Sequence, residues 1–249
     1  MLKFIKSWKN KIKYVYWIIF LFIIILSSVG YLFLKENSPL FLREAPFSHS
    51  EYIFGLDVSH YQGRINWKRV STSKHPIKFV FIRSTMGING KDKQFLYNWR
   101  KAKDFGYVRG AYHYYRPNEN PESQFLNYKK TVRLSKGDFI PILDVEQMGR
   151  KGRKRLRQDI SIWLKMAEKE YGVKPMVYTG LHFYKRNLKG QINDYPLWVA
   201  SYNRKFRIRR LNWTFHQFTD RVRVEGIKVL TDGNDFNGSM EQLLGMCLK

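Results

Sequence analysis

Two carboxylic acids stand two residues apart at the end of an apolar run, in the segment FIPILDVE at residues 139–146. The run predicts a buried strand, and because alternate strand residues point the same way, Asp144 and Glu146 should project together from its end. Neighbouring carboxylates move each other's pKa values apart, so that one can donate a proton while the other stays charged. Cleavage of a glycosidic bond uses such a pair. Taken alone, the pattern is more often a strand that ends in two solvated acids, so the surrounding residues decide its interpretation.

Short apolar runs alternate with amphipathic stretches from residue 52 onward. Strands are predicted at residues 53–58, 79–83, 108–115, 139–145, 175–178, 197–202 and 214–218, with a weaker one at 228–230. Apolar residues keep helical spacing at 95–105, 125–132 and 160–171, and Gly172 is a favourable C-cap for the last helix. Strands that alternate with helices predict a parallel α/β sheet, and about eight of them can close into a TIM-type (β/α)8-like barrel. The domain is small for that fold, so we expect a modified barrel with some helices reduced to loops.

The acids fall at the ends of predicted strands. In a parallel barrel the active site lies at the carboxyl ends of the strands. Asp57 ends the first strand, Asp144 and Glu146 end the fourth, and Asp235 lies in the last segment. We therefore expect these four acids to gather on one face, with Asp57 and Asp235 on strands that adjoin when the barrel closes.

Aromatic and polar side chains end several other strands. The candidates for substrate binding are Tyr112, Tyr114, Tyr178, Trp198, Tyr202 and Gln217. Acids surrounded by aromatic rings suit a sugar chain, because the C–H faces of sugars stack on rings while their hydroxyls bond to polar groups. Core packing is the alternative, with equal weight for Tyr112, Tyr114 and Trp198. His113 and His216 are expected to be structural. The sequence has no metal-ligand spacing, P-loop or G-x-S-x-G motif, so we predict no metal and no cofactor.

The composition is strongly basic. The chain has 249 residues, 44% of them hydrophobic, which is enough for one large domain or two small ones with a substantial core. A formal net charge of +25 indicates a polyanionic neighbour: nucleic acid, an anionic membrane surface or an anionic cell-wall polymer. The single cysteine, Cys247, rules out an internal disulfide and a cysteine-based metal or redox site.

The N-terminal region predicts a membrane anchor. Residues 15–34 (VYWIIFLFIIILSSVGYLFL) carry no charge and are long enough to cross a bilayer as a helix. Lysines precede them at positions 3, 6, 9, 11 and 13, and positive charge is retained on the cytoplasmic side. We expect a cytoplasmic basic segment at 1–14, a transmembrane anchor at 15–34, a linker at 35–51 and an extracytoplasmic domain, periplasmic or at the cell surface, at 52–249. A cleaved signal peptide is the alternative, although its apolar region would be shorter.

An ordered set of motifs resembles one known family. The segment GLDVSHYQG at residues 55–63, followed by INW at 65–67, resembles the opening of the glycoside hydrolase family 25 lysozymes (N-acetylmuramidases). The resemblance continues through FVFIR (79–83), GAYHY (110–114), PILDVE (141–146), VYTG (177–180), LWVASY (197–202), QF (217–218) and DFN (235–237). Family members often carry an acid in an A-T-E-G-like segment after the second strand, where this chain has STMG at 84–87. That departure concerns the substrate subsites more than the acids.

The resemblance implies a substrate and a role for each acid. The expected reaction is hydrolysis of the β-1,4 bond between N-acetylmuramic acid and N-acetylglucosamine in peptidoglycan, on a flattened barrel with few helices. Glu146 would be the general acid, and Asp144 would stay ionised and orient or stabilise the reacting sugar. Asp57 and Asp235 would complete the acidic cluster, and Tyr178 would help to position the substrate. The nucleophile is left open between water, a carboxylate and the sugar's own acetamido group, with the acetamido route preferred.

Three other functions are compatible with parts of the sequence. A barrel could bind cell wall without cleaving it, although retention of all four acids argues against this. A membrane-tethered nucleic-acid binder is suggested by charge alone, but the chain has no recognised nucleic-acid motif, and we predict no nucleic-acid partner. A hydrolase of chitin-like chains would use the same scaffold. The sequence makes no prediction about the oligomeric state.

Basic residues directly follow two of the predicted strands. One run comprises Arg150, Lys151, Arg153, Lys154, Arg155 and Arg157, and the other Arg204, Lys205, Arg207, Arg209 and Arg210. Both runs should lie on or beside the catalytic face, where they could hold anionic wall polymer by Coulomb attraction that salt would screen. The alternative is a solvated helix start and a solvated loop.

Overall fold

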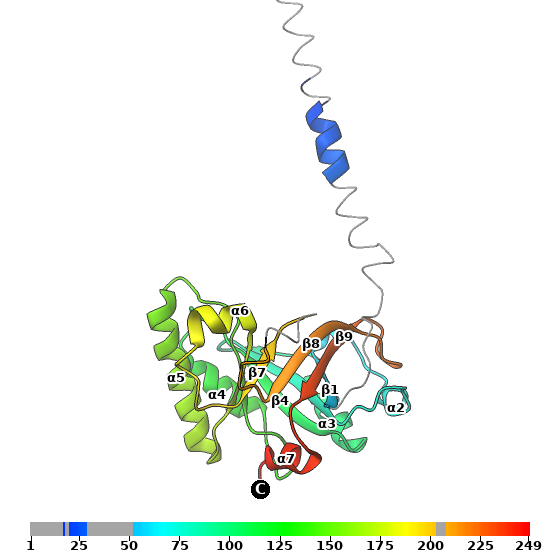
Figure 1. The fold of residues 1–249 in the computed structure, drawn as a ribbon, viewed down its shortest axis with the longest axis vertical. Helices are drawn as coiled ribbons and strands as arrows, with labels where there is room; N and C mark the ends of the chain where they lie inside the picture. Colours follow the sequence, from blue (N-terminus) through cyan, green and yellow to red (C-terminus); the bar gives the residue numbers. More distant parts are fainter. Residues whose placement is uncertain (1–16, 18–19, 29–51, 203–207) are drawn as a thin grey trace, which may run out of the picture. The chain divides into compact units, whose positions relative to one another are not determined.

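The computed structural model describes residues 17, 20–28, 52–202 and 208–249 (Figure 1). The chain divides into two compact units, residues 1–43 and 44–249. In the first unit, residues 20–28 are helical and their side chains are exposed. Among the described residues, no helix is both long enough and apolar enough to cross a membrane. Half of the predicted anchor at 15–34, and all of the segments 1–14 and 35–51, lie outside the described residues, so the anchor remains a prediction.

Eight strands of the second unit close into a barrel. They are β1 (Ile53–Val58), β2 (Phe79–Met86), β4 (Val108–Tyr114), β5 (Ile142–Asp144), β6 (Met176–Gly180), β7 (Leu197–Ala200), β8 (Phe215–Val222) and β9 (Thr231–Phe236). They pair in this order, and the sheet closes because β1 pairs with both β2 and β9. The short strand β3 (Gly90–Lys91) extends β2 as a hairpin outside the closed ring. The predicted barrel is therefore confirmed.

The last strand departs from the predicted parallel order. All pairings from β1 through β2, β4, β5, β6 and β7 to β8 are parallel. Strand β9 is antiparallel to both of its neighbours, β8 and β1. The prediction of a strand at residues 228–230 is wrong, because those residues belong to the short connection between β8 and β9. The connection from Val222 to Thr231 is too short for the crossover that a parallel neighbour needs, so β9 returns antiparallel to β8.

Helices cover the outside of the parallel strands. The predicted helices correspond to α3 (Phe95–Asp104), α4 (Pro121–Thr131) and α5 (Gly152–Tyr171). Helix α5 ends at Gly172, whose left-handed backbone (φ 68°) forms the predicted C-cap. Shorter elements are η1 (His60–Gln62), α2 (Trp67–Val70), α6 (Leu181–Phe183), the π-helix η2 (Tyr184–Leu188) and α7 (Met240–Gly245). In the described part of the chain no helix follows β7 or β8 directly, as expected for a barrel with reduced helices.

Strand alternation divides the apolar side chains into two cores. On β2, Phe79 and Phe81 point into the barrel, whereas Val80 and Ile82 belong to the core between the barrel and its helices. The interior is filled mainly by aromatic rings, with the centroids of Phe81 and Trp198 lying 4.5 Å apart. Leu243 of α7 also belongs to the interior cluster, and Figure 1 shows α7 beneath the strands. The interior is thus a packed core, and only one end of the barrel remains for a site.

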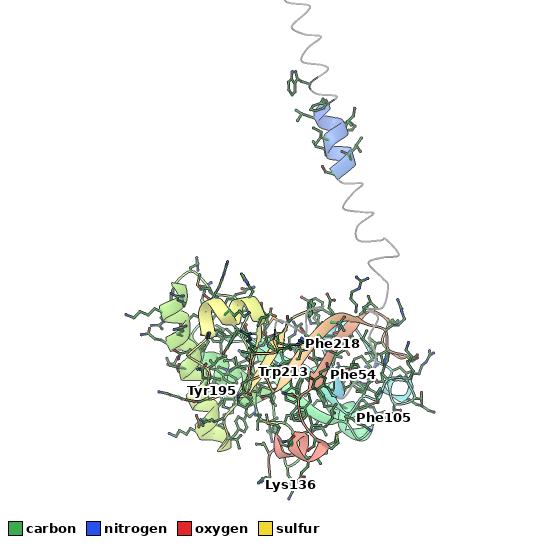
Figure 2. The ribbon with its side chains drawn as sticks, in the orientation of Figure 1. Phe54, Phe105, Lys136, Tyr195, Trp213 and Phe218 are labelled. Atoms are coloured by element: carbon green, nitrogen blue, oxygen red, sulfur yellow. The ribbon has the colours of Figure 1, made fainter. Side chains whose placement is uncertain are left out.

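The outer core continues around β1 and β8. The rings of Phe54 and Phe218 lie 6.3 Å apart between centroids, and Figure 2 labels both on the same side of the barrel, near Trp213. Their side chains stand on the face of the strands opposite to the barrel interior, because Gly55 and Gln217, the neighbouring positions, face inward. This alternation decides which acids of the same strands can reach the site.

Candidate active site

A pocket of about 450 Å³ lies at the carboxyl ends of the parallel strands. It is lined by Asp57, Val58, Ser59, Tyr61, Gln62, Arg83, Met86, Tyr112, Tyr114, Asp144, Glu146, Tyr178, Trp198, Tyr202, Gln217 and Asp232. The structure therefore brings together every site residue predicted from the sequence except Asp235. It adds residues that the sequence had not singled out, among them Asp232 and Arg83.

Strand β5 supplies the acid pair at the centre of the pocket. Asp144 is the last residue of the strand and is buried, with 5% of its surface exposed, whereas Glu146 lies two residues further on and is exposed. Oδ1 of Asp144 has no hydrogen-bond partner among the residues that the structure describes. The pair thus combines an acid that a substrate can reach from the pocket mouth with a second acid beneath it, which offers a free acceptor.

Asp57, on β1, is held by two side-chain amides. Its Oδ2 accepts hydrogen bonds of 2.8 Å from Nε2 of Gln217 and from Nδ2 of Asn234. Asn234 in turn accepts a hydrogen bond of 2.8 Å from Nε1 of Trp198. The amide donors lie 160 and 177 residues from Asp57 along the chain, so only closure of the barrel brings them to it. The Asp57 carboxylate is therefore fixed in position.

The same network reaches two tyrosines. Oε1 of Gln217 accepts hydrogen bonds from the hydroxyls of Tyr178 at 2.9 Å and Tyr202 at 2.8 Å. The Tyr178 hydroxyl is also within hydrogen-bonding reach of Glu146, whose pKa this contact lowers. Because a phenol carries one proton, Tyr178 can donate to Gln217 or to Glu146 but not to both at once. It therefore couples the general-acid candidate to the amide network.

Asp232, and not Asp235, is the acid that β9 contributes to the pocket. Strand β9 runs antiparallel to β1, so Asp57 is opposite Asp232 at the start of β9, whereas Asp235 is opposite Phe54 at the other end of β1. Asp235 is also one residue out of phase with Asn234 and Asp232, and so it lies on the outer face of the strand. The expectation that Asp235 joins the acidic cluster is therefore wrong. Asp232 precedes Asp235 in the same segment, but the sequence did not show that this segment runs antiparallel to β1.

Arg83 is the cation among the pocket-lining residues. Its Nε lies 3.0 Å from Oδ2 of Asp92, which is buried, and its guanidinium also contacts Nδ1 of His60. The guanidinium carbon lies 5.1 Å from the ring centroid of Tyr61. These contacts fix a positive charge beside the acids, and that charge lowers the pKa of Asp144. A strand pattern of alternating apolar residues gives no sign of this role.

Burial and crowding raise the pKa of each acid in the cluster. Burial raises the pKa of Asp57 to about 6, although the hydrogen bonds from Asn234 and Gln217 oppose the shift. Burial and the neighbouring Asp57 raise the pKa of Asp232 to about 9. Burial, followed by the charges of Glu146 and Asp57, raises the pKa of Asp144 well above its ordinary value. Partial loss of water around its carboxyl raises the pKa of Glu146 as well. The cluster therefore retains protons at neutral pH.

These shifts bear on the expected roles of the acid pair. The resemblance implies an ionised Asp144, whereas the protein by itself favours the neutral form of this buried acid. The charge of Glu146 contributes to the shift at Asp144, so the protonation of one carboxyl affects that of the other. A donor that bonds to Oδ1 of Asp144 would favour its anion and leave the proton with Glu146.

Aromatic rings form both the floor and the rim of the pocket. Trp198 is 1% exposed and packs against Tyr178 at 4.4 Å between ring centroids, so it belongs mainly to the core. Tyr112 is likewise buried, while Tyr114 is partly exposed. Tyr202 and Tyr61 are 42% and 72% exposed, and both can offer a ring face to a sugar. Tyr61 lies in η1, shortly after the end of β1. Its position as an aromatic residue just after a strand end could have identified it from the sequence.

The two histidines near the strand ends are structural, as predicted. His113 is buried and is hydrogen-bonded through Nδ1 to Thr85 at 2.8 Å and through Nε2 to Gln124 at 3.2 Å. Nε2 of His216 lies 3.0 Å from the carbonyl oxygen of Ser201. Within residues 52–202 and 208–249 no group of histidines, cysteines and acids is arranged to hold a metal ion.

Comparison with known proteins gives a consistent result. The model of the family described as glycosyl hydrolases family 25 matches residues 56–227. Lysozyme M1 of Streptomyces globisporus is 29% identical, over 77% of this chain and 70% of that protein. The Escherichia coli (strain K12) protein YegX is 43% identical, over 77% of this chain and 72% of that protein.

Two solved structures share the fold over nearly their whole length. A family 25 glycosyl hydrolase from Bacillus anthracis superposes with a TM-score of 0.70 at 28% identity, over 81% of this chain and all (100%) of that one. The bacterial lysozyme from Streptomyces coelicolor superposes with a TM-score of 0.69 at 27% identity, over 80% of this chain and 98% of that one.

Proposed function

Because this chain belongs to glycosyl hydrolase family 25 and is a glycoside hydrolase of the lysozyme type, we propose that it is a peptidoglycan muramidase. The bond cleaved is the β-1,4 linkage between N-acetylmuramic acid and N-acetylglucosamine. The observation that carries the proposal is the position of Glu146, exposed at the mouth of the pocket, above the buried Asp144. Exposed tyrosines at the rim suit a polysaccharide that lies across this mouth.

Glu146 is the general acid of the proposed mechanism. It gives its proton to the glycosidic oxygen as the bond from that oxygen to the anomeric carbon breaks. Burial raises its pKa, which favours the protonated form that a general acid needs. When the leaving sugar has departed, the same carboxylate removes a proton from the incoming water.

Asp144 orients the reacting sugar through its carboxylate, which lines the pocket. The N–H of the substrate's 2-acetamido group can donate to this carboxylate, which favours the aspartate anion and leaves the proton with Glu146. The acetamido oxygen, turned toward the anomeric carbon, then forms a bond to it as the glycosidic bond breaks. Water opens the resulting ring and restores the acetamido group.

Asp57 stabilises the positive charge that develops on the sugar ring. Asp57 is held by Gln217 and Asn234, so it does not have to reorient as the charge appears. Asp232, opposite it on β9, holds a proton that limits the repulsion between the two carboxyls. Arg83 balances the remaining negative charge from the side of β2.

Replacing Glu146 with glutamine tests the assignment. Glu146→Gln keeps the size of the side chain but removes the acid, so we expect hydrolysis of purified peptidoglycan to fall by at least about 10²-fold while the circular dichroism spectrum is unchanged. Release of reducing ends, with mass spectrometry of the new sugar end, measures both the rate and the bond. Undiminished hydrolysis by the variant would refute the role of Glu146. Cleavage of chitin oligomers but not of peptidoglycan would refute the proposed substrate.

We also propose that residues 15–34 anchor the protein in a membrane, with the N-terminus in the cytoplasm and the barrel outside. The support is the uncharged length of this segment and the lysines that precede it. Such an anchor would hold the enzyme within reach of the wall that it cleaves.

A further inference from the structure

A basic hollow lies along helix α5, apart from the catalytic pocket. Its volume is about 770 Å³, and Arg153, Lys154, Arg155, Arg157 and Lys165 contribute to its lining. The one acid in that lining, Asp159, is buried and lies 2.8 Å from Nε of Arg155. Figure 2 shows long side chains that extend from the outer side of α5. The hollow therefore carries a clear excess of positive charge.

Two of these arginines are held in place by backbone carbonyls of the segment that contains η2. Nε and Nη2 of Arg157 donate to the carbonyl oxygens of Asn187 and Lys189 at 2.6 and 3.1 Å. Nη1 of Arg153 donates to the carbonyl oxygen of Arg186 at 3.1 Å. A guanidinium has five N–H donors, so both arginines keep donors for a ligand. Because the cations are already ordered, a ligand loses little by ordering them.

The segment around η2 connects this hollow with the catalytic pocket. A second groove is lined by Glu146, Tyr178 and Tyr202, which it shares with the catalytic pocket, and by Lys185 of η2. Lys185 is followed at once by Arg186, whose carbonyl binds Arg153. Cations therefore occur both in the groove and on α5, on segments that are hydrogen-bonded to each other, and we call this set the basic band. It consists of Lys185, Arg186, Lys189, Arg153, Lys154, Arg157 and Lys165.

We propose that the basic band binds the acidic peptide branch of the same glycan whose sugar backbone lies in the catalytic pocket. The inference rests on the proposed function, because peptidoglycan carries short peptides with free carboxylates on its N-acetylmuramic acid units. An extended peptide of four residues spans about 13–14 Å, which is the scale of two to three turns of α5. Guanidinium groups bind carboxylates through paired hydrogen bonds. The substrate itself thus delivers the ligand to the band.

Contact between the peptide branch and the basic band should strengthen substrate binding without changing the rate of bond cleavage. Once the glycan is in the pocket, its peptide meets the band at a high effective concentration, so weak individual contacts add to affinity. The contacts are exposed to solvent, and added salt will weaken them. Loss of the band should therefore raise KM and leave kcat unchanged.

A charge-neutralised variant of the whole chain tests the proposal. Lys154, Lys165 and Lys189 are exposed, lie in the band and make no side-chain contact that the fold needs, so all three are changed to glutamine. The matched control changes Lys68, Lys103 and Lys136, exposed lysines on other elements, with the same loss of charge. Figure 2 labels Lys136 close to α7. Both variants and the wild type are assayed on peptidoglycan free of phosphate polymers, and on the same glycan after an amidase has removed the peptides.

We expect the band variant to raise KM about 5- to 10-fold on intact peptidoglycan, with kcat unchanged, and to match the wild type on the peptide-free glycan. The control variant should match the wild type on both. An unchanged KM on intact peptidoglycan, or an equal rise on both substrates, would overturn the proposal. The proposal would also be overturned if the rise in KM appeared only when phosphate polymer is added, because the ligand of the band would then be that polymer. Failure of the wild type on both substrates would remove the proposed function, and the inference with it.

Discussion

At the scale of single residues, the side of the strand decides which acid takes part in the site. Asp232 and Asp235 lie three residues apart on β9, yet only Asp232 lines the pocket, opposite Asp57. Asp235 is buried and Asp232 is partly exposed, because their side chains point to opposite faces of the strand. Their two carboxyls should therefore respond differently to the same conservative substitution.

Changing each of these aspartates to asparagine separates catalysis from folding. Asp232→Asn removes an acid whose proton is linked to the charge of Asp57 and puts in its place an amide that cannot titrate, so we expect kcat to fall by about 10- to 100-fold. Asp235→Asn alters a buried group on the outer face, so we expect a lower melting temperature and an unchanged kcat per folded molecule. Initial rates of reducing-end release, normalised to folded protein, measure the effect. A larger loss of kcat in Asp235→Asn would contradict the placement.

The raised pKa of Asp232 also makes stability depend on pH. In the folded protein its pKa is about 9 against an ordinary value of 3.8, so the folded state binds the proton more tightly than the unfolded state. This contribution to stability is complete below the ordinary pKa and is lost as pH rises toward 9. Asp232→Asn removes it, so the melting temperature of the variant relative to the wild type should rise between pH 5 and pH 8. If the difference in melting temperature between variant and wild type stays constant, or becomes smaller, from pH 5 to pH 8, the raised pKa of Asp232 would be contradicted.

At the scale of elements, the strand ends act as fixed supports because the barrel interior is filled. Gly55 on β1 and Phe79 on the neighbouring strand β2 are paired and pack against each other inside the barrel. A Cβ atom on Gly55 would lie 2.5 Å from three ring atoms of Phe79, so the Phe79 ring occupies the space that a side chain at Gly55 would need. Gly55 stands two residues before Asp57, on the same face of the strand. The close packing therefore positions the carboxylate.

Adding a methyl group at Gly55 should disturb this support. Gly55→Ala forces the Phe79 ring or the strand to move, and we expect a loss of about 1–3 kcal/mol in the free energy of unfolding. Gly245→Ala, at the end of α7, is the matched control, because a Cβ there has no neighbour within 4 Å. Urea denaturation followed by tryptophan fluorescence measures both. Equal stability of the two variants would show that the barrel yields at Gly55 without cost.

At the scale of the whole molecule, the long apolar segment and the clustered positive charge lie in different parts of the chain. The uncharged segment 15–34 lies near the N-terminus, while the basic band lies on the barrel beside the catalytic pocket. If the segment is an anchor, the two features act together: one keeps the enzyme at the membrane and the other holds the acidic part of its substrate.

Fractionation tests the anchor directly. We expect the full chain to stay in the membrane pellet after washing with alkaline carbonate, because about 20 apolar residues in a bilayer resist extraction by salt and pH. A chain that begins at residue 50 should be released. Release of the full chain by carbonate, or a mature N-terminus located after residue 34, would rule out a retained anchor.

The sequence by itself determined the elements whose signals are local. Hydrophobic periodicity placed most strands and the helices α3, α4 and α5, and the apolar run before Asp144 and Glu146 identified the central acid pair. The ordered motifs identified the family. The tertiary structure alone decided the direction of β9, the exchange of Asp235 for Asp232, and the amide network around Asp57, whose partners are 160 or more residues away. Strand direction and long-range hydrogen bonds depend on how the barrel closes. Closure brings together segments that are far apart along the chain, and the local sequence of one segment does not indicate which other segment it will pair with.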